Sequence, residues 1–347
     1  MKRLIITLAA AATAAGASAQ QWGGLLMDKD LLMPTDMIEL SQTQFNFGTA
    51  RAMAMAGAFT SLGADLSSMS LNPAGLGMYR RNEIALTPMM TFQSSETPGT
   101  MSYAKNGKNR FSMANFGAAL NAYEGTGTLT SFTVGIGLNR IADFNSRYSF
   151  SSESRYDPDR PDRLMPTIAD IFSQQMNNFG VRPDREAEGG GPNGPVPVDA
   201  WNPNVWPAIL AYDAYMLGNY GTVKDPIWAV ERIGRNASVL HSMDVVNSGS
   251  INEFTISMGG NINNILYFGA SIGIQSVHKK LGVTYQEEYG YFNTDGIGHD
   301  GSGNALAEQL DVMNLYQEME MNGSGVNFKL GFTARPLTGL RVGVAFH

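Results

Sequence analysis

The chain has 347 residues, of which 39 are glycine and none is cysteine, and its formal net charge is −7. The lack of cysteine excludes disulfides and a lipid-modified N-terminal cysteine, and the acidic balance without a basic stripe argues against nucleic acid as a partner. Aromatic residues make up 10% and charged residues 16%, which suits a β-barrel at least as well as a soluble enzyme.

Residues 1–19 have the pattern of a secretory signal peptide. Lys2 and Arg3 form a charged start, Leu4–Ala15 is a short apolar run, and Ala17–Ala19 is a small-residue cleavage site. This apolar run is too short to span a bilayer, and no later stretch has the length of a transmembrane helix. We therefore expect an exported protein that is either soluble or embedded in the outer membrane through strands.

Residues 20–81 combine a short helical stretch with a run of small residues. Residues 28–40 lack clean periodicity and predict loop and a short helix. From Phe47 to Tyr79 glycine and alanine are frequent, so the backbone can lie close against other walls. Asn72 and Pro73 are a turn-forming pair, because proline fixes φ and asparagine bonds its own backbone. The pattern predicts a compact segment that ends in a tight turn and leads into a sheet.

This segment resembles the N-terminal signature of the FadL/TodX family of outer-membrane transporters, most closely its Bacteroidetes-type members. The resemblance rests on Gly48-Thr-Ala-Arg-Ala-Met-Ala-Met-Ala-Gly57, on Ala64-Asp65 and on Asn72-Pro73-Ala74-Gly75-Leu76. Members of that family form a fourteen-stranded barrel whose N-terminal segment folds back as a hatch. The resemblance therefore implies that residues 20–81 form a hatch, with a hatch motif at Gly48, Arg51, Gly57, Asn72, Pro73 and Ala74.

Alternating apolar and polar residues predict antiparallel strands after residue 82. The predicted strands span residues 83–93, 110–123, 129–139, 251–262, 265–275, 326–335 and 340–346. Pro88 predicts that the first is an edge or bent strand, and a phase shift near Ala114 predicts a bulge in the second. Asn263 and Asn264 form a two-residue hairpin turn.

Connection lengths favour a barrel over a soluble sandwich. The predicted turns near Glu124, Asn263 and Pro336 are tight, whereas the connections at 94–109, 147–249 and 277–312 are long, and the two kinds alternate. Outer-membrane barrels have short periplasmic turns and long external loops. We expect an all-β, antiparallel transmembrane barrel over residues 82–347, with a partly helical external loop at 147–249. With about seven strands, the resemblance implies half of the family's barrel, truncated at its C-terminal end.

The period of two assigns the strand residues to faces. The residues expected to face lipid are Phe254, Ile256, Leu266, Phe268, Ile272, Phe328 and Leu330. The charges expected to face the lumen are Glu253, Lys329, Arg335 and Arg341. At lumen positions such as Ser257 and Ser271, arginine is expected to cost less stability than at a lipid-facing position in the middle of the bilayer. An interfacial aromatic girdle is predicted from Tyr267, Tyr285, Tyr289, Tyr291 and Phe292.

The long external loop has helical spacing over residues 165–179 and helix-like runs at 207–217 and 226–235. It also concentrates aromatic side chains, namely Trp201, Trp206, Tyr212, Tyr215 and Trp228. These residues predict a small packed cap. The resemblance implies instead a capture site for hydrophobic ligands above the pore.

The sequence carries no motif for catalysis or for a cofactor. The four histidines lack metal-ligand spacing, and no catalytic Ser-His-Asp motif or phosphate-binding glycine loop is present. We therefore expect no enzyme activity, no cofactor and no metal.

The resemblance implies a channel for hydrophobic compounds such as long-chain fatty acids or aromatic hydrocarbons, with external capture, hatch rearrangement and lateral release. The implied partners are the outer-membrane bilayer, hydrophobic small molecules and the outer-membrane insertion machinery. One alternative is a related barrel that acts as a secretion-system shuttle or structural porin without a lipid substrate. The other is an exported soluble β-sandwich that serves as a binding protein or an enzyme.

Overall fold

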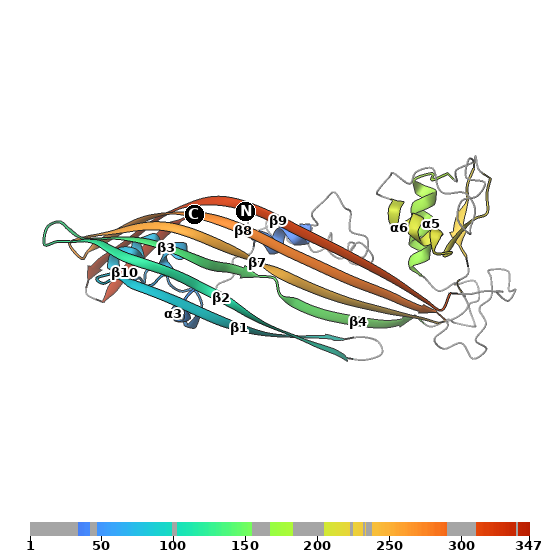
Figure 1. Ribbon diagram of the computed structural model, residues 1–347, viewed down its shortest axis with the longest axis horizontal. Coiled ribbons are helices and arrows are strands. Elements are labelled where there is room, and N and C mark those ends of the chain that lie inside the picture. The colour runs from blue at the N-terminus through green and yellow to red at the C-terminus, as the bar shows by residue number, and fades with distance from the viewer. Residues whose placement is uncertain are drawn as a thin grey trace, which may run out of the picture.

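A long curled sheet and a small helical cap make up most of the structure. The computed structural model describes residues 34–41, 47–98, 103–154, 167–182, 205–222, 225–231, 233, 238–289, 310–337 and 339–347. Figure 1 shows the cap at one end of the sheet and the short helices that follow residue 47 at the other. The predicted signal peptide lies outside the described residues.

The sheet is antiparallel throughout, as the alternation predicted. Its eight strands are β1 (Glu83–Pro98), β2 (Tyr103–Glu124), β3 (Leu129–Asp143), β4 (Ser146–Ser154), β7 (Val239–Ile262), β8 (Leu266–Tyr289), β9 (Val312–Leu337) and β10 (Leu340–Phe346). The order is β1-β2-β3-β7-β8-β9-β10, and β4 pairs with β7 beyond the end of β3. The prediction missed β4, which lies at the start of the presumed external loop.

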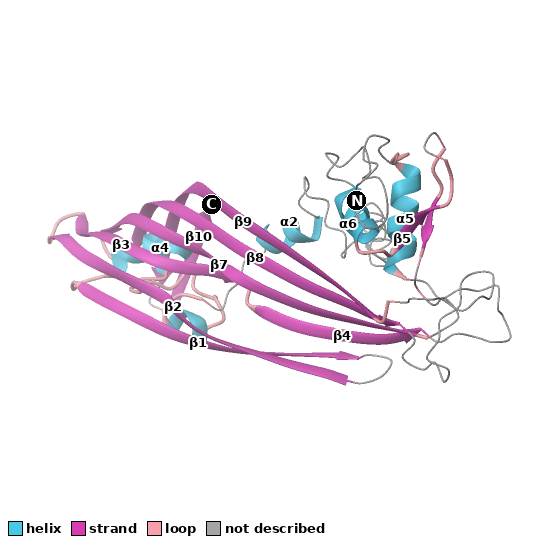
Figure 2. Cartoon of the chain, turned by 45° about the vertical axis from the view of Figure 1, so that its right-hand side comes forward, coloured by secondary structure: helices cyan, strands magenta, loops and turns pink. Residues whose placement is uncertain are grey.

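The helices fall into two groups. Figure 2 shows them in cyan, with α5 and α6 beyond one end of the sheet, α4 near the other end, and α2 beside the middle of the long strands. Before β1 come α2 (Pro34–Ser41), α3 (Ala50–Ala54), α4 (Ser68–Leu71) and the 3-10 helix η1 (Pro73–Met78). The cap holds α5 (Ile168–Asn178), α6 (Trp206–Asp213) and the small ribbon of β5 (Leu217–Asn219) and β6 (Trp228–Val230). None of the helices in the described ranges has the length and apolar character needed to cross a bilayer.

The strands continue well beyond the predicted bounds. β8 has 24 residues, which makes it roughly 80 Å long at about 3.3 Å per residue. Residues 94–98 and 103–109 of the connection predicted at 94–109 are strand, and so are residues 277–289 of the connection predicted at 277–312, whose residues 290–309 lie outside the described residues. The presumed loop 147–249 begins inside β4 and ends inside β7. In β7, β8 and β9 the predicted bounds were wrong because the apolar residues move to the opposite face of the sheet at this level, so the alternation changes phase.

Local details of the strands agree with the sequence. Thr87 pairs with Asn115 and Pro88 with Met113, so Ala114 is the extra residue of a bulge, as predicted. β1 is an edge strand of the sheet, as Pro88 predicted. Asn263 and Asn264 have φ values of 52° and 58°, which a tight hairpin turn requires.

The cap is packed around its own apolar core. This confirms the prediction of a small packed cap. Side chains of α5, α6 and β6, among them Phe172, Tyr212 and Trp228, bury themselves against the ends of β7, β8 and β9. The helix predicted over 165–179 is confirmed as α5. The helix-like run at 226–235 was a wrong prediction, because residues 228–230 pair as strand β6 and bury the Trp228 ring.

The predicted aromatic girdle is wrong for the tyrosines that the structure describes. Tyr267, Tyr285 and Tyr289 are all buried on the face that carries the cap and the N-terminal helices. Tyr285 and Tyr289 belong to the core of the cap. Tyr291 and Phe292 lie outside the described residues.

Residues 47–79, which we call the inner segment, lie against one face of the sheet, which we call the inner face. Gly259, Gly269 and Gly331 are aligned across β7, β8 and β9 by the strand register. A Cβ atom built on any of them would collide with η1 or with Asn72, which precedes it. The backbone of the inner segment therefore reaches the backbone of the sheet at a row of glycines.

Replacing Gly269 by valine should displace the inner segment. The new Cβ would collide with the carbonyl group of Pro73, so we expect a loss of about 1–3 kcal/mol in the free energy of unfolding. Gly325→Val on β9 is the matched control, because no atom of the described residues lies within 4 Å of a Cβ there. Denaturant unfolding measures the loss of stability, and limited proteolysis within residues 47–79 measures the displacement of the inner segment. Equal stability and equal proteolysis of the two variants would contradict the contact.

Candidate functional site

The outer face of the sheet, opposite the inner segment, carries a continuous set of exposed apolar side chains. Ile84 is 76% exposed and Phe328 is 68% exposed. We call this set the apolar belt; it consists of Ile84, Leu86, Met90, Phe92, Phe111, Met113, Phe116, Leu120, Val134, Ile136, Leu138, Phe254, Ile256, Met258, Leu266, Ile272, Ile274, Val326, Phe328, Leu330, Phe332, Val342, Val344 and Phe346.

Six of the seven residues predicted to face lipid belong to this belt. The seventh, Phe268, is partly buried on the same face.

The inner face at the same level is polar and holds a buried ion pair. Glu253 of β7 is fully buried, and its Oε1 lies 2.5 Å from Nζ of Lys329 on β9. Gly273 lies between them on β8, and a side chain there would collide with the carboxylate of Glu253. The two charges predicted to face inward therefore meet each other, across a strand that leaves room for their contact.

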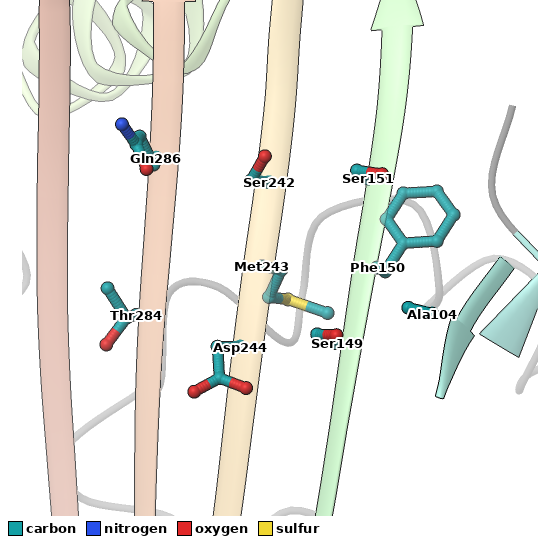
Figure 3. Close-up of a pocket in the computed structure, with 9 residues that line it drawn as sticks. All are labelled: Ala104, Ser149, Phe150, Ser151, Ser242, Met243, Asp244, Thr284 and Gln286. Atoms are coloured by element: carbon teal, nitrogen blue, oxygen red, sulfur yellow. The ribbon is translucent and has the colours of Figure 1, made fainter. Parts of the chain in front are cut away.

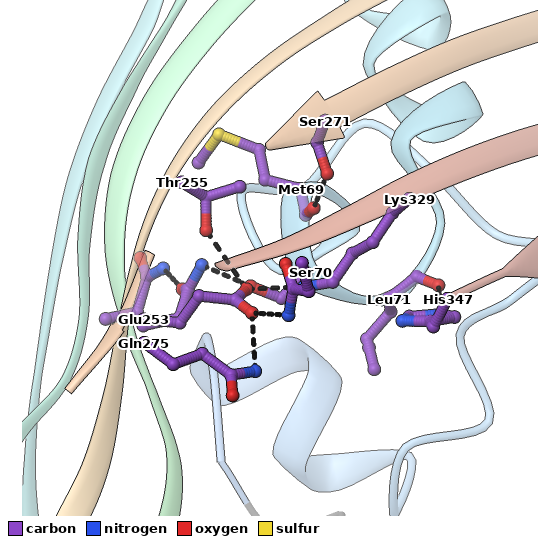
Figure 4. A network of polar contacts seen from close by, with 12 residues as sticks. Met69, Ser70, Leu71, Glu253, Thr255, Ser271, Gln275, Lys329 and His347 are labelled. Atoms are coloured by element: carbon purple, nitrogen blue, oxygen red, sulfur yellow. Dashed lines mark hydrogen bonds and ion pairs between the residues drawn. The ribbon is translucent and has the colours of Figure 1, made fainter. Parts of the chain in front are cut away.

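The carboxylate of Glu253 also binds the inner segment (Figure 4). The hydroxyl of Ser70 donates to Oε1 at 2.8 Å, and the amide of Asn139 donates to that hydroxyl at 2.8 Å. Other donors to the same carboxylate are Thr255, Gln275 and Asn327. A buried charge needs such a full set of partners, so this network connects the wall of the sheet to α4 of the inner segment.

Asn72 makes a second connection between the inner segment and the sheet. Its side-chain amide donates to the carbonyl of Thr60 at 2.6 Å and to the hydroxyl of Thr333 on β9 at 3.3 Å. Its side-chain oxygen accepts from the N–H of Ala74 at 3.1 Å and so caps η1, with Pro73 as the first helical residue. Asn72, Pro73 and Ala74 thus share one function: they fix the start of η1 on the sheet.

Gly48, Arg51 and Gly57 act within the inner segment itself. Gly48 has φ 113° and Gly57 has φ 77°, a region that favours glycine. The guanidinium of Arg51 donates to the carbonyl of Ala64 at 3.2 Å and lies over the ring of Phe59. These predicted motif residues shape the fold of the segment and do not belong to the Glu253 network.

Arg335 and Arg341 lie apart from the buried ion pair. Arg341 is exposed and its guanidinium contacts the sulfur of Met78 at 3.7 Å, while Arg335 is half-buried near the hairpin that joins β7 to β8. The expectation that arginine costs less at Ser257 and Ser271 than on the outer face assumed an open lumen at these positions, and the structure shows none there. Both are buried under the inner segment, and the Ser271 hydroxyl donates to the carbonyl of Met69 at 3.0 Å.

A second buried carboxylate, Glu287, holds the cap and was missed by the sequence analysis. It accepts from the backbone N–H of Ile168 at 2.9 Å and from the hydroxyls of Tyr285 and Tyr289 at 2.7 and 2.8 Å. His241 lies 3.2 Å from it. The spacing Tyr285-x-Glu287-x-Tyr289 places three polar groups on one strand face and could have indicated the cluster.

The two tyrosines remain neutral donors to Glu287. They lie in the part of β8 beyond the apolar belt, and burial, reinforced by the neighbouring carboxylate, raises the pKa of Tyr285 and of Tyr289 far above the ordinary value. Their hydroxyl groups therefore keep their protons and stabilise the buried charge below the cap.

A small cavity on the outer face gives no sign of chemistry. It has a volume of about 300 Å³ and lies beside β4, β7 and β8 (Figure 3). Its lining consists of Ala104, Ser149, Phe150, Ser151, Ser242, Met243, Asp244, Thr284 and Gln286. Asp244 is its one titratable side chain and pairs with Arg147 at 3.1 Å. Within the described ranges, no group of three or more histidine or carboxylate side chains is placed to bind a metal.

Comparison with known proteins adds no assignment, since no family model, curated protein or solved structure matches the chain.

Removing either partner of the Glu253–Lys329 pair should destabilise the protein strongly. Glu253→Gln leaves a buried ammonium group and Lys329→Met leaves a buried carboxylate, so each should lower the free energy of unfolding by about 3–5 kcal/mol. The double variant should lose less than the sum of the two. Denaturant unfolding measures these values.

Glu318→Gln provides the control for this prediction, because Glu318 forms an exposed ion pair with Lys280. That variant should unfold as the parent protein does. Additive losses in the double variant, or losses no larger than that of the control, would contradict the role of the buried pair.

Proposed function

We propose that the chain forms the wall and the hatch of an outer-membrane channel for hydrophobic compounds such as long-chain fatty acids or aromatic hydrocarbons. The observation that carries the proposal is a change of faces within single strands. Near one end of β7, β8 and β9 the outer face is apolar and the inner face polar, and in the rest of these strands the arrangement is reversed.

The change occurs at one level across the sheet. Leu138, Phe254, Ile274 and Val326 are register neighbours and form the last apolar level of the outer face. The next outer level is polar and consists of Arg140, Asn252, Ser276 and Ser324. The β7–β8 and β8–β9 ladders pass this level without a register shift, so the same strand faces are being compared.

Beyond this level the sheet has the pattern of a protein surface in water. The outer positions of β9 include Glu318, Glu320 and Asn322, while the inner positions of β7 and β8 include the buried Val245 and Val283. A sheet wholly in water would keep its apolar residues on the covered face throughout. A strand that leaves a bilayer must instead exchange its faces, because lipid lies outside it on one side of the boundary and water on the other.

The depth of the belt suits a membrane. On β7 the outer apolar positions extend from Phe254 to Ile262, which is close to the roughly 9–11 residues that a tilted transmembrane strand needs. The longer part of the strands would then project outside the bilayer with the cap at its tip. This orientation supports capture of ligands by the projecting part.

A discontinuity in the wall supports lateral release. The β2–β3 ladder reaches no further than Asn115 and Asn139, although β2 continues to Tyr103 and the chain beyond β3 continues as β4. We call this region the wall break. Side chains bridge it: Asn106 donates to Ser149 at 2.7 Å, and Lys108 donates to the carbonyl of Asn247 at 2.6 Å.

The inner segment supports the role of a movable hatch. It lies across the inner face and is held by polar contacts at Ser70 and Asn72 as well as by the buried apolar residues Leu66, Met69 and Leu76. Polar contacts of this kind can be exchanged for water when a ligand displaces the segment. Displacement would open a path from the inner face to the wall break.

An arginine in the middle of the apolar belt should destabilise the membrane-embedded protein, and the loss should depend on depth. Leu330→Arg should cost about 2–4 kcal/mol, whereas Ser324→Arg, on the same face of β9 at the polar level, should cost about 0–1 kcal/mol. Unfolding in lipid vesicles measures both. In a protein surrounded by water both positions are exposed and both variants would be tolerated, which would refute the membrane orientation.

Locking the inner segment to the wall should stop transport. The chain has no cysteine, so the pair Ser70→Cys and Asn139→Cys, whose native side chains are in contact, introduces a single disulfide. Under oxidising conditions we expect loss of uptake of a labelled fatty acid or aromatic hydrocarbon by cells, with recovery after reduction. The two single variants are the controls, and unchanged uptake by the oxidised pair would show that the segment does not gate the path.

A further inference from the structure

We propose that the wall break holds a binding site for the anionic headgroup of an amphiphile, formed by Arg140, Arg110 and Lys108. The shared chemistry of such headgroups is a carboxylate or phosphate attached to an apolar chain. The proposal rests on the proposed function, because it uses the membrane boundary that the apolar belt defines.

Arg140 is the central residue, because its guanidinium is buried with donor capacity unused. Its side chain is 9% exposed, and its Nη1 donates to Oδ2 of Asp143 at 3.0 Å. Its Nε is buried and has no hydrogen-bond partner among the residues that the structure describes. A buried donor without an acceptor is costly, and an anion that accepts from this N–H would remove that cost.

The positively charged side chains at the wall break outnumber the carboxylates that they contact in the described part of the chain. Nη1 of Arg110 lies 3.8 Å from Oδ1 of Asp143 and donates to the carbonyl of Gly249 at 3.1 Å. The ammonium group of Lys108 donates to the carbonyl of Asn247. Carbonyl oxygens satisfy hydrogen bonds without neutralising charge. Among the described residues, Arg140 and Arg110 therefore share the carboxylate of Asp143, and the ammonium group of Lys108 contacts a carbonyl oxygen. A second anion would balance the charge of the group.

The position of Arg140 points to an amphiphile rather than a free ion. Arg140 follows Leu138 on the outer face and belongs to the first polar level beyond the apolar belt. An acyl chain lying along Leu138 and Phe116, both exposed on the outer face, would bring its headgroup to this level. Arg110 and Lys108 alternate with the outer residue Phe111 on β2, so they approach the wall break from its inner side, where they contact the carbonyls of Gly249 and Asn247. A neutral hydrocarbon could use the same apolar surface but would leave the guanidinium unpaired.

The site can be tested on the native protein in a neutral maltoside detergent at pH 8. We would titrate dodecyl phosphate, dodecanoate and dodecanol, which share one chain and differ in the headgroup, and measure binding by calorimetry. Both anions should bind at least about tenfold more tightly than dodecanol, as expected for a charge-assisted hydrogen bond. Inorganic phosphate alone should bind much more weakly than dodecyl phosphate.

Three variants locate the site. Arg140→Gln should abolish the preference for anions, whereas Arg147→Gln should keep it, because Arg147 is already paired with Asp244 in two parallel hydrogen bonds. Asp143→Asn should tighten anion binding several-fold, because it removes the competing carboxylate. This gain could not result from misfolding.

Equal binding of dodecanol and the two anions would overturn the proposal, and so would equal effects of the Arg140 and Arg147 variants. Inorganic phosphate that binds as tightly as dodecyl phosphate would show a site for free anions and would refute the amphiphile. If Leu330→Arg is destabilising in vesicles but the anion preference is absent, this inference fails and the proposed function stands. If Leu330→Arg is tolerated in vesicles, the proposed function fails instead.

Discussion

The close contact between the backbone of the inner segment and the backbone of the sheet is the constraint on which the rest of the structure depends. Glycines at Gly259, Gly269 and Gly331 leave the space that η1 and Asn72 occupy. With η1 fixed there, Ser70 comes within hydrogen-bond distance of Glu253, and the buried charge of Glu253 gains a partner outside its own sheet. A bulkier row on these strands would push the segment away and leave the polar inner face without its cover.

This contact also explains why a polar inner face is compatible with an apolar outer face. Glu253 and Lys329 neutralise each other, and the inner segment supplies hydrogen bonds where water would otherwise be needed. The outer residues of the same strands are exposed in the described part of the chain, and under the proposed function this exposure is favourable because lipid surrounds them. Farther along the strands the inner face becomes apolar and the cap covers its end, with Glu287 fixed below α5.

Much of this architecture could be predicted from sequence, and the failures have specific physical causes. The period of two located the belt on β7, β8 and β9, and Asn72-Pro73 located the turn that caps η1. The predicted strands are shorter than the observed ones because the apolar positions change from even to odd residue numbers near Ser276 and Ser324. In the sequence this change resembles the end of a strand. The Glu253–Lys329 contact, the glycine row and the wall break depend on strand register, which the sequence of a single chain does not reveal.

The central claim is that the outer face of the belt contacts lipid, and a nitroxide scan along β9 tests it most directly. Because the native chain has no cysteine, single cysteines at residues 324–334 can be labelled one at a time. In lipid vesicles the account predicts that even positions from 326 to 332 collide freely with oxygen and hardly with a water-soluble nickel chelate, while odd positions are shielded from both. Strong collision of the nickel chelate with labels at 328 and 330 would place this face in water and contradict the account.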